Sequence, residues 1–224
     1  MNSVTIRDLT SIEEFEGCMD LQREGFERSN LDLMPVRLYA VFRHVGGLIL
    51  GAFDGGTLVG FLSAIPGIRN GTPYWHSHML AVTATHRNAG IGAQLKFAQK
   101  ERALKQGIRL IEWTFDPLVS RNAYLNIEKL GVIVRRYYPS FYRRDEDRLV
   151  AEWWLERPRP AVRGDVRRVT IPADLDAAQS ERIRVREEFL TNFKEDFFVA
   201  AFERRGETSD YVFIQGASRA DHTD

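Results

Sequence analysis

Cysteine is almost absent from this sequence, and no apolar run approaches the length of a membrane span. Cys18 is the one cysteine in 224 residues, which excludes a disulfide framework within the chain. It falls in a predicted helix, where we expect a buried and unreactive thiol rather than a nucleophile. We also expect that the protein has no signal peptide. We therefore expect a cytoplasmic protein that has no membrane partner.

An excess of either charge is missing too. Lysine and arginine together number 31, aspartate and glutamate together number 31, and the formal net charge is zero. Such a chain lacks the positive field that draws proteins to nucleic acid, so we expect no nucleic-acid partner. Arginine pairs such as Arg135-Arg136 have acidic residues nearby, and we interpret them as solvated surface.

The most informative stretch is a glycine-containing loop between an apolar strand and a helix. The strand ends at Val82, and the loop at 87–93 holds Gly90 and Gly92. Two glycines one residue apart let a ligand approach the backbone amides closely. Apolar residues then recur at helical spacing, and Gly107 stands where a glycine would end that helix.

This loop predicts a binding site for a phosphate-bearing ligand. The start of a helix leaves several N–H groups unpaired at the positive end of the helix dipole, which suits an anion. Asn88 is the only obvious side chain to cap the helix, so the remaining donors are available to a ligand. A nucleotide-binding P-loop would need Gly-Lys-Ser/Thr where this chain has Gly92-Ala93-Gln94. A Rossmann fingerprint would need a third glycine at Leu95.

The loop resembles the Arg-x-x-Gly-x-Gly pattern that binds the pyrophosphate of acyl-CoA in the GNAT superfamily of N-acetyltransferases. An ordinary glycine turn before a helix is the alternative. The resemblance implies acetyl-CoA or another acyl-CoA as co-substrate. It also implies that the strand before the loop binds the pantetheine through its backbone. The cofactor-binding residues implied here are Leu80, Ala81, Val82, Arg87, Asn88, Ala89, Gly90, Ile91, Gly92 and Ala93.

The predicted order of elements agrees with the GNAT architecture. Asp54-Gly55-Gly56 and Asn70-Gly71 are hairpin signals between apolar runs. We therefore expect an α/β fold of the α+β kind, with a mixed, mostly antiparallel central sheet of about seven strands flanked by helices. Its strands are predicted at 4–9, 48–53, 57–65, 74–82, 109–115, 132–138 and 149–155. Its helices are predicted at 12–26, 36–42, 91–104 and 120–130.

A proline-rich segment at 157–160 predicts a boundary, because its residues suit neither a helix nor a central strand. We predict a GNAT domain at 1–156 and a C-terminal extension at 157–224. The extension has the order β-α-β-β, with strands at 166–171, 197–202 and 211–215 and one helix over 175–193. We expect it to pack on the core or to bury a homodimer interface. Similarity between 169–171 and 4–6 leaves a half-repeat open.

The segment after the fifth strand resembles the family only in part. The block at 128–131 (Glu-Lys-Leu-Gly) is similar to one that follows the fourth helix of the family. Counting back from it, the asparagine that usually contacts CoA falls on Ser120, and a frequent catalytic tyrosine falls on Ile127. Asn122 and Asn126 are the nearest replacements for that asparagine. We assign Ser120 and Asn122 to the CoA site.

The family resemblance implies that the substrate amine attacks the thioester directly, so a base and an acid are required. For the base we favour Glu112 and His78 equally. Glu112 lies among apolar residues of a strand, and His78 shares a strand face with His76. Either residue is equally well explained as a structural one. The histidine pair lacks a recognisable third ligand, so we expect no metal. Tyr124 is the first candidate for the acid, and the tyrosines at 137 and 138 are the less favoured alternatives.

Residues 116–131 also resemble a poorly characterised GNAT branch whose members are associated with N-succinylation of amino acids. Succinyl-CoA is then a candidate donor, and Arg121 or Arg135 would hold a carboxylate. The expected function is transfer of an acyl group, acetyl or succinyl, from CoA to a primary amine of a small molecule such as an amino acid. The alternative is a non-catalytic acyl-CoA sensor or partner-binding module, which the missing tyrosine at Ile127 favours.

Overall fold

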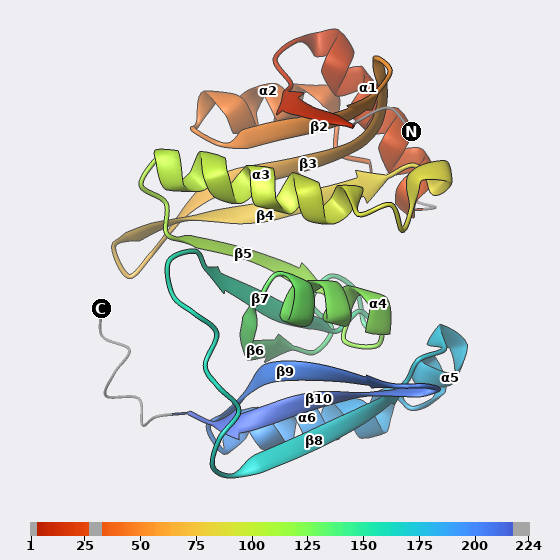
Figure 1. Cartoon of the computed structure of the whole chain (residues 1–224), viewed down its shortest axis with the longest axis vertical. Helices are drawn as coiled ribbons and strands as arrows, with labels where there is room; N and C mark the ends of the chain where they lie inside the picture. Colours follow the sequence, from red (N-terminus) through yellow and green to blue (C-terminus); the bar gives the residue numbers. More distant parts are fainter. Residues whose placement is uncertain (1–3, 27–32, 217–224) are drawn as a thin grey trace. The chain divides into compact units, whose positions relative to one another are not determined.

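A computed structural model describes residues 4–26 and 33–216 of the chain, which forms two compact units (Figure 1). The first unit spans Met1–Ile111 and the second spans Glu112–Asp224. The boundary predicted at 156/157 therefore lies inside the second unit. Residues 217–224 of the predicted extension lie outside the described residues.

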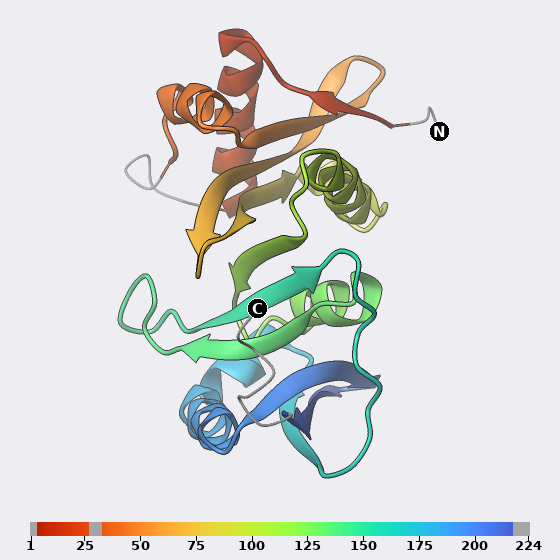
Figure 2. The same ribbon diagram turned by 90° about the vertical axis from the view of Figure 1, so that its left-hand side faces the viewer.

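The first unit is a four-stranded antiparallel sheet with helices on both faces (Figure 2). Two helices pack on one face, and the helix that follows the glycine loop packs on the other. Both hairpin turns form where predicted, with Asn70 and Gly71 at φ of 50° and 79°. The strands, in spatial order, are β1 (Thr5–Asp8), β2 (Leu48–Asp54), β3 (Thr57–Arg69) and β4 (Thr72–Val82). The helices are α1 (Ile12–Phe26), α2 (Val36–His44) and α3 (Ile91–Lys105).

The core of the first unit is apolar and contains the single cysteine. Phe15 of α1 stacks on Tyr39 of α2, with ring centroids 5.7 Å apart, and Phe61 of β3 meets Tyr39 edge to face. Cys18 lies fully buried in the same cluster. Burial raises the pKa of its thiol to about 12, because desolvation disfavours the thiolate. The prediction that this cysteine is buried is confirmed.

The second unit continues the antiparallel pattern into the extension. Residues 112–115 of β5 (Leu110–Phe115) belong to it, and Val134 of β6 pairs with Val199 of β9. The extension therefore adds its strands beside β6. The spatial order after β5 is β7 (Arg148–Trp154), β6 (Ile133–Tyr138), β9 (Phe197–Arg205), β10 (Thr208–Gln215) and β8 (Val166–Pro172). Within the described residues, seven strands precede residue 157 and three follow it, in a mostly antiparallel arrangement flanked by helices, as predicted.

Two helices predicted in the second unit are each divided in the structure. The helix expected over 120–130 is an α-helix, α4 (Ser120–Ala123), that runs into a π-helix, η3 (Tyr124–Lys129). The single helix expected over 175–193 is two helices, α5 (Leu175–Ser180) and α6 (Arg182–Lys194). The side chain of Asp174 caps α5 by accepting from the Ala177 amide.

The order of elements in the extension parallels the start of the chain, but the strand pairing differs. Both segments run strand, helix, helix, strand, strand. In the first unit β1 pairs with β2, the next strand along the chain, whereas β8 pairs with β10 and not with β9. The sequence similarity between the two segments therefore does not extend to topology.

A buried carboxylate ties α6 to the hairpin of β6 and β7. Asp147 is 2% exposed and accepts from Arg186 at 2.7 and 2.9 Å, from the Ser140 amide and from the Tyr137 hydroxyl. Burial raises the pKa of Asp147, but these hydrogen bonds outweigh that effect and hold its pKa below the usual value. The extension is thereby attached through a charged pair that is largely shielded from water.

We expect Asp147→Asn to lower the free energy of unfolding at pH 7 by about 3–5 kcal/mol, because it leaves Arg186 without its carboxylate. A carboxyl whose pKa is lower in the folded state stabilises above its unfolded pKa and loses that effect as pH falls through the folded value. The difference between variant and wild type should therefore shrink below about pH 4. Urea unfolding at pH 7 measures the loss in the free energy of unfolding, and urea unfolding at pH 3 measures how far that loss has decreased. Asp145→Asn, on the exposed part of the same loop, is the control; equal effects of the two variants would contradict the prediction.

Candidate active site

The loop between β4 and α3 depends on a backbone conformation that glycine adopts readily. α3 begins at Ile91, and its N-cap is Gly90, with φ of 80°. Gln94 donates its amide to the Gly90 carbonyl at 3.1 Å and closes the first turn. A left-handed φ strains any residue that has a Cβ, so conformation favours glycine at position 90. Leu80, Ala81 and Val82 complete β4 before the loop and pair with β3.

No side chain caps the N-terminus of α3. The expected cap, Asn88, does not serve, because it occupies a left-handed turn with φ of 64° before Gly90. The first turn therefore presents amide donors at the positive end of the dipole of a 15-residue helix. A Cβ at Gly92 would meet only Leu80, at 3.5 Å, which is an ordinary contact. Packing therefore does not require glycine at position 92.

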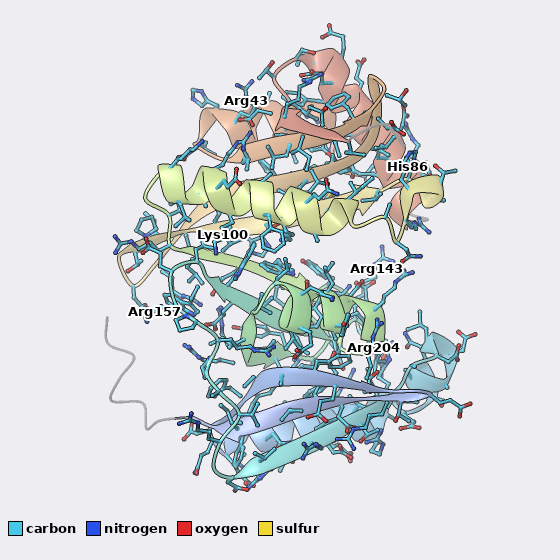
Figure 3. All side chains as sticks on the ribbon, in the orientation of Figure 1. Arg43, His86, Lys100, Arg143, Arg157 and Arg204 are labelled. Atoms are coloured by element: carbon cyan, nitrogen blue, oxygen red, sulfur yellow. The ribbon has the colours of Figure 1, made fainter. Side chains whose placement is uncertain are left out.

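A hydrogen-bonded turn, η2 (Ala84–His86), holds the start of the loop. His86 Nδ1 lies 2.9 Å from the hydroxyl of Thr83 and 2.9 Å from that of Thr85. Its Nε2 lies 3.3 Å from a carboxylate oxygen of Asp54 on β2 (Figure 3). These contacts attach the loop to the sheet and leave residues 87–90 exposed.

β4 carries a bulge at His78. Consecutive residues of β3 pair with Ser77 and Met79, which leaves His78 as the extra residue on β4. Bulges commonly re-aim side chains beside functional sites. His78 is exposed, and its ring lies 5.7 Å from Phe42 of α2 and 6.4 Å from His76. The two histidines therefore share a face, as their spacing predicts.

Lys96 of α3 is a buried residue beside this bulge that the sequence analysis missed. Its Nζ donates to the Ser77 hydroxyl at 2.8 Å. Burial lowers the pKa of Lys96 well below its usual value, because desolvation disfavours the ammonium. Helical periodicity gave a signal for it, since position 96 falls on the buried face that includes Leu95 and Gln99.

Glu112 of β5 is 3% exposed and belongs to an ion-pair network in the second unit. Arg136 of β6 pairs with Glu112 and reaches Glu152 of β7 at 3.4 Å. Arg135 also reaches Glu152, at 3.5 Å. Glu112 therefore has a structural partner as well as the burial that suggested it as a base.

The interpretation of Arg135-Arg136 as solvated surface was wrong. Neighbouring strand residues normally point to opposite faces. Here Val134 and Arg136 pair with consecutive residues of β7, so Arg135 occupies a bulge. The bulge lets both arginines reach the buried carboxylate of Glu152. A bulge of this kind leaves no clear sign in the order of residues.

The segment from α4 to the end of η3 carries the remaining predicted site residues. Ser120 is buried, and its hydroxyl lies 2.9 Å from that of Ser209 on β10. Asn122 is exposed on α4. Tyr124 is half-buried, with the guanidinium of Arg204 centred 4.1 Å from its ring centroid. Asn126 is buried and accepts from the Trp113 indole at 3.3 Å.

The predicted residues thus form two groups, each within one unit. The loop, Leu80–Val82 and His78 belong to the first unit, and Glu112 and the segment 120–124 belong to the second. Among residues 4–26 and 33–216, no group of three or more His, Cys, Asp or Glu side chains could hold a metal ion. In the same residues, no helix combines the length and apolar character that crossing a membrane requires.

A family model described as the acetyltransferase (GNAT) family matches residues 15–132, which is more than half of the chain. The match includes strands β2 to β5, the glycine loop and the π-helix, and it leaves out β1. The chain belongs to the GNAT family. No relative was found among curated proteins by sequence.

Solved GNAT structures resemble this GNAT protein over about two thirds of its length. The aminoglycoside 6′-acetyltransferase type Ii is 22% identical, with a TM-score of 0.57 over 70% of this chain and 99% of its own. The protein yncA from Salmonella typhimurium, with its cofactor acetyl-CoA, is 16% identical, with a TM-score of 0.57 over 69% and 95%. A chain of the NatC complex bound to Gag peptide and CoA is 18% identical, with a TM-score of 0.57 over 68% of this chain and 98% of its own. At these identities the likeness shows the fold.

Proposed function

We propose that this GNAT protein transfers an acyl group from acyl-CoA to a primary amine of a small molecule such as an amino acid. The uncapped N-terminus of α3 carries the proposal, because its loop at 87–93 follows the Arg-x-x-Gly-x-Gly pattern and offers amide donors to a pyrophosphate. We assign the loop, the backbone of Leu80–Val82, Ser120 and Asn122 to CoA. The hydroxyl of Ser120 already bonds Ser209, so Asn122 is the better placed of the two.

In the proposed reaction the amine nitrogen attacks the thioester carbonyl, the C–N bond forms and the C–S bond breaks. A base must take a proton from the ammonium, and an acid must give one to the thiolate. Glu112 and His78 are the proposed bases, and Tyr124 is the proposed acid. His78 is supported by its exposure at a bulge, and Glu112 by its burial in a strand.

The proposal has two forms, one with an acetyl donor and one with a succinyl donor. Arg135 already pairs with Glu152, so of the two arginines considered for a succinyl carboxylate, Arg121 is the one exposed without a carboxylate partner among the described residues. An acetyl donor needs no such arginine. The aminoglycoside acetyltransferase supports a small-molecule acceptor, and the peptide-bound complex shows that the same fold also accompanies peptide binding.

A second candidate function is a non-catalytic acyl-CoA sensor. Ile127, at the position where the family often has a catalytic tyrosine, is fully buried and has no group that can donate a proton. The nearest tyrosine that could replace it as the proton donor is Tyr124, and the guanidinium of Arg204 covers one face of the Tyr124 ring.

A thiol-release assay that crosses acetyl-, succinyl- and longer acyl-CoA donors with amine acceptors tests the proposal. We expect turnover with one short acyl donor and a small primary amine, at a rate that rises with pH as the ammonium loses its proton. The panel should contain amino acids, polyamines, an aminoglycoside and a short peptide. Tight CoA binding without turnover on any acceptor would favour the sensor. Turnover on the peptide alone would replace the small-molecule acceptor with a protein N-terminus.

A further inference from the structure

The extension contacts the α4–η3 segment at several points between Ser120 and Glu128, and these contacts lie within the second unit. Tyr211 of β10 donates its hydroxyl to the Pro117 carbonyl at 2.7 Å. Ser209 reaches Ser120, and Arg204 covers the ring of Tyr124 (Figure 3). The segment that carries the proposed acid is therefore held from outside the part of the chain that the family model matches.

The strongest of these contacts concern Glu128, near the end of η3. Arg159, in the linker before β8, donates to both carboxylate oxygens of Glu128, at 2.7 and 3.3 Å. The same carboxylate accepts from the amide of Phe202 on β9 at 2.8 Å. A bidentate arginine pair fixes orientation as well as distance.

Arg159 also bonds the π-helix backbone itself. It donates to the Ile127 carbonyl at 2.7 Å. Within the helix, the Leu130 amide donates to the Leu125 carbonyl, five residues earlier, at 3.0 Å. A π-helix is rare, occurs mostly as a single turn within an α-helix, and is frequent at functional sites. Arg159 thus supplies a partner for a carbonyl at the end of this unusual turn.

We propose that Arg159 and Glu128 are positioning residues that hold residues 124–129 in the π-helical register and thereby orient Tyr124. This inference rests on the proposed function, in which Tyr124 protonates the leaving thiolate. Arg204 and Lys129 lie over the ring of Tyr124, at 4.1 and 5.3 Å from its centroid. A change of register moves Tyr124 relative to both of these cations. The extension then positions the proposed acid, although it contributes no catalytic residue.

Arg159→Ala is the test, and Arg157→Ala is the matched control. Arg157 belongs to the same linker and is exposed, and its side chain lies over the Trp154 ring, away from α4 (Figure 3). We expect Arg159→Ala to keep its affinity for CoA and its KM for acyl-CoA. Its kcat should fall by about 10- to 100-fold, since a misplacement of about 1 Å can cost about 100-fold. Arg157→Ala should retain the kcat of the wild type.

Hydrogen exchange gives a second readout that needs no turnover. The Leu130 amide should exchange at least about tenfold faster in Arg159→Ala, while amides of α6 exchange as in the wild type. Arg159→Lys keeps one donor for the Ile127 carbonyl and should restore part of both properties; it also serves if the alanine variant does not fold. Wild-type kcat and wild-type exchange at Leu130 in Arg159→Ala, or equal losses in Arg157→Ala, would overturn the inference. A wild-type protein that transfers no acyl group would instead refute the proposed function, and the exchange result would still decide whether Arg159 sets the register.

Discussion

Gly92→Asp is expected to fold like the wild type and to bind CoA at least about 100-fold more weakly. The fold tolerates a side chain at this position, because a Cβ would make only an ordinary contact with Leu80. The new carboxylate would face the pyrophosphate of the ligand, and two like charges 4 Å apart near a protein surface repel by about 4 kcal/mol. It would also occupy the amide donors at the N-terminus of α3. Calorimetric titration with CoA measures the loss.

Gly92→Ala is the matched control for this variant. It adds the Cβ without the charge, so we expect a much smaller loss of CoA affinity than in Gly92→Asp. Gly90 is the poorer position for the test, since its φ of 80° would strain any other residue and confuse folding with binding. A folded Gly92→Asp protein with unchanged affinity would show that the ligand does not bind this loop.

The second large effect concerns the base. If Glu112 is the base, Glu112→Gln lowers kcat by about 10²- to 10⁴-fold and leaves CoA affinity nearly intact. If His78 is the base, His78→Gln does so instead. Steady-state kinetics over a range of pH separates them, because only loss of the true base also changes the pH profile. Normal rates and profiles in both variants would exclude both residues and favour deprotonation by water or by the substrate itself.

The ion pair of Glu112 makes a structural control necessary. Glu112→Gln also removes the carboxylate that pairs with Arg136, so some loss of activity can follow from disturbance of the sheet. Glu152→Gln removes another buried carboxylate from the same arginine. If Glu112 acts as a base, Glu112→Gln should lose far more activity than Glu152→Gln at a similar loss of stability. Equal losses of activity would assign Glu112 a structural role. His78→Gln removes a ring contact with Phe42, so its stability is measured alongside its activity.

Local signals accounted for the boundaries of most elements. Ser11 and Glu14, three residues apart at the start of α1, form a capping box, with the Ser11 amide 3.1 Å from the Glu14 carboxylate. Gly131, with φ of 75°, ends the helical segment that begins at Ser120. These features involve residues a few positions apart, so the sequence contains all of the information that they need.

The two bulges were not predictable in the same way. A bulge at His78 or at Arg135 depends on the register between two strands, and that register depends on packing across the sheet. The alternation of residues in one strand does not show where its partner skips a residue. This is why Arg135 and Arg136 looked like solvated surface and are in fact paired with buried carboxylates.

The sequence by itself determined the glycine loop, the order of strands and helices around it and the family, because each depends on local spacing and turn chemistry. Tertiary structure decided the state of the segment that follows β5. Residues 120–130 have an ordinary helical pattern, and the π register of 124–129 is accompanied by bonds from Arg159 and the Phe202 amide, which lie 31 and 74 residues from Glu128. A helix register that is stabilised by contacts so distant along the chain cannot be found from the helix's own residues, since the favourable interactions exist only once the extension has folded against it.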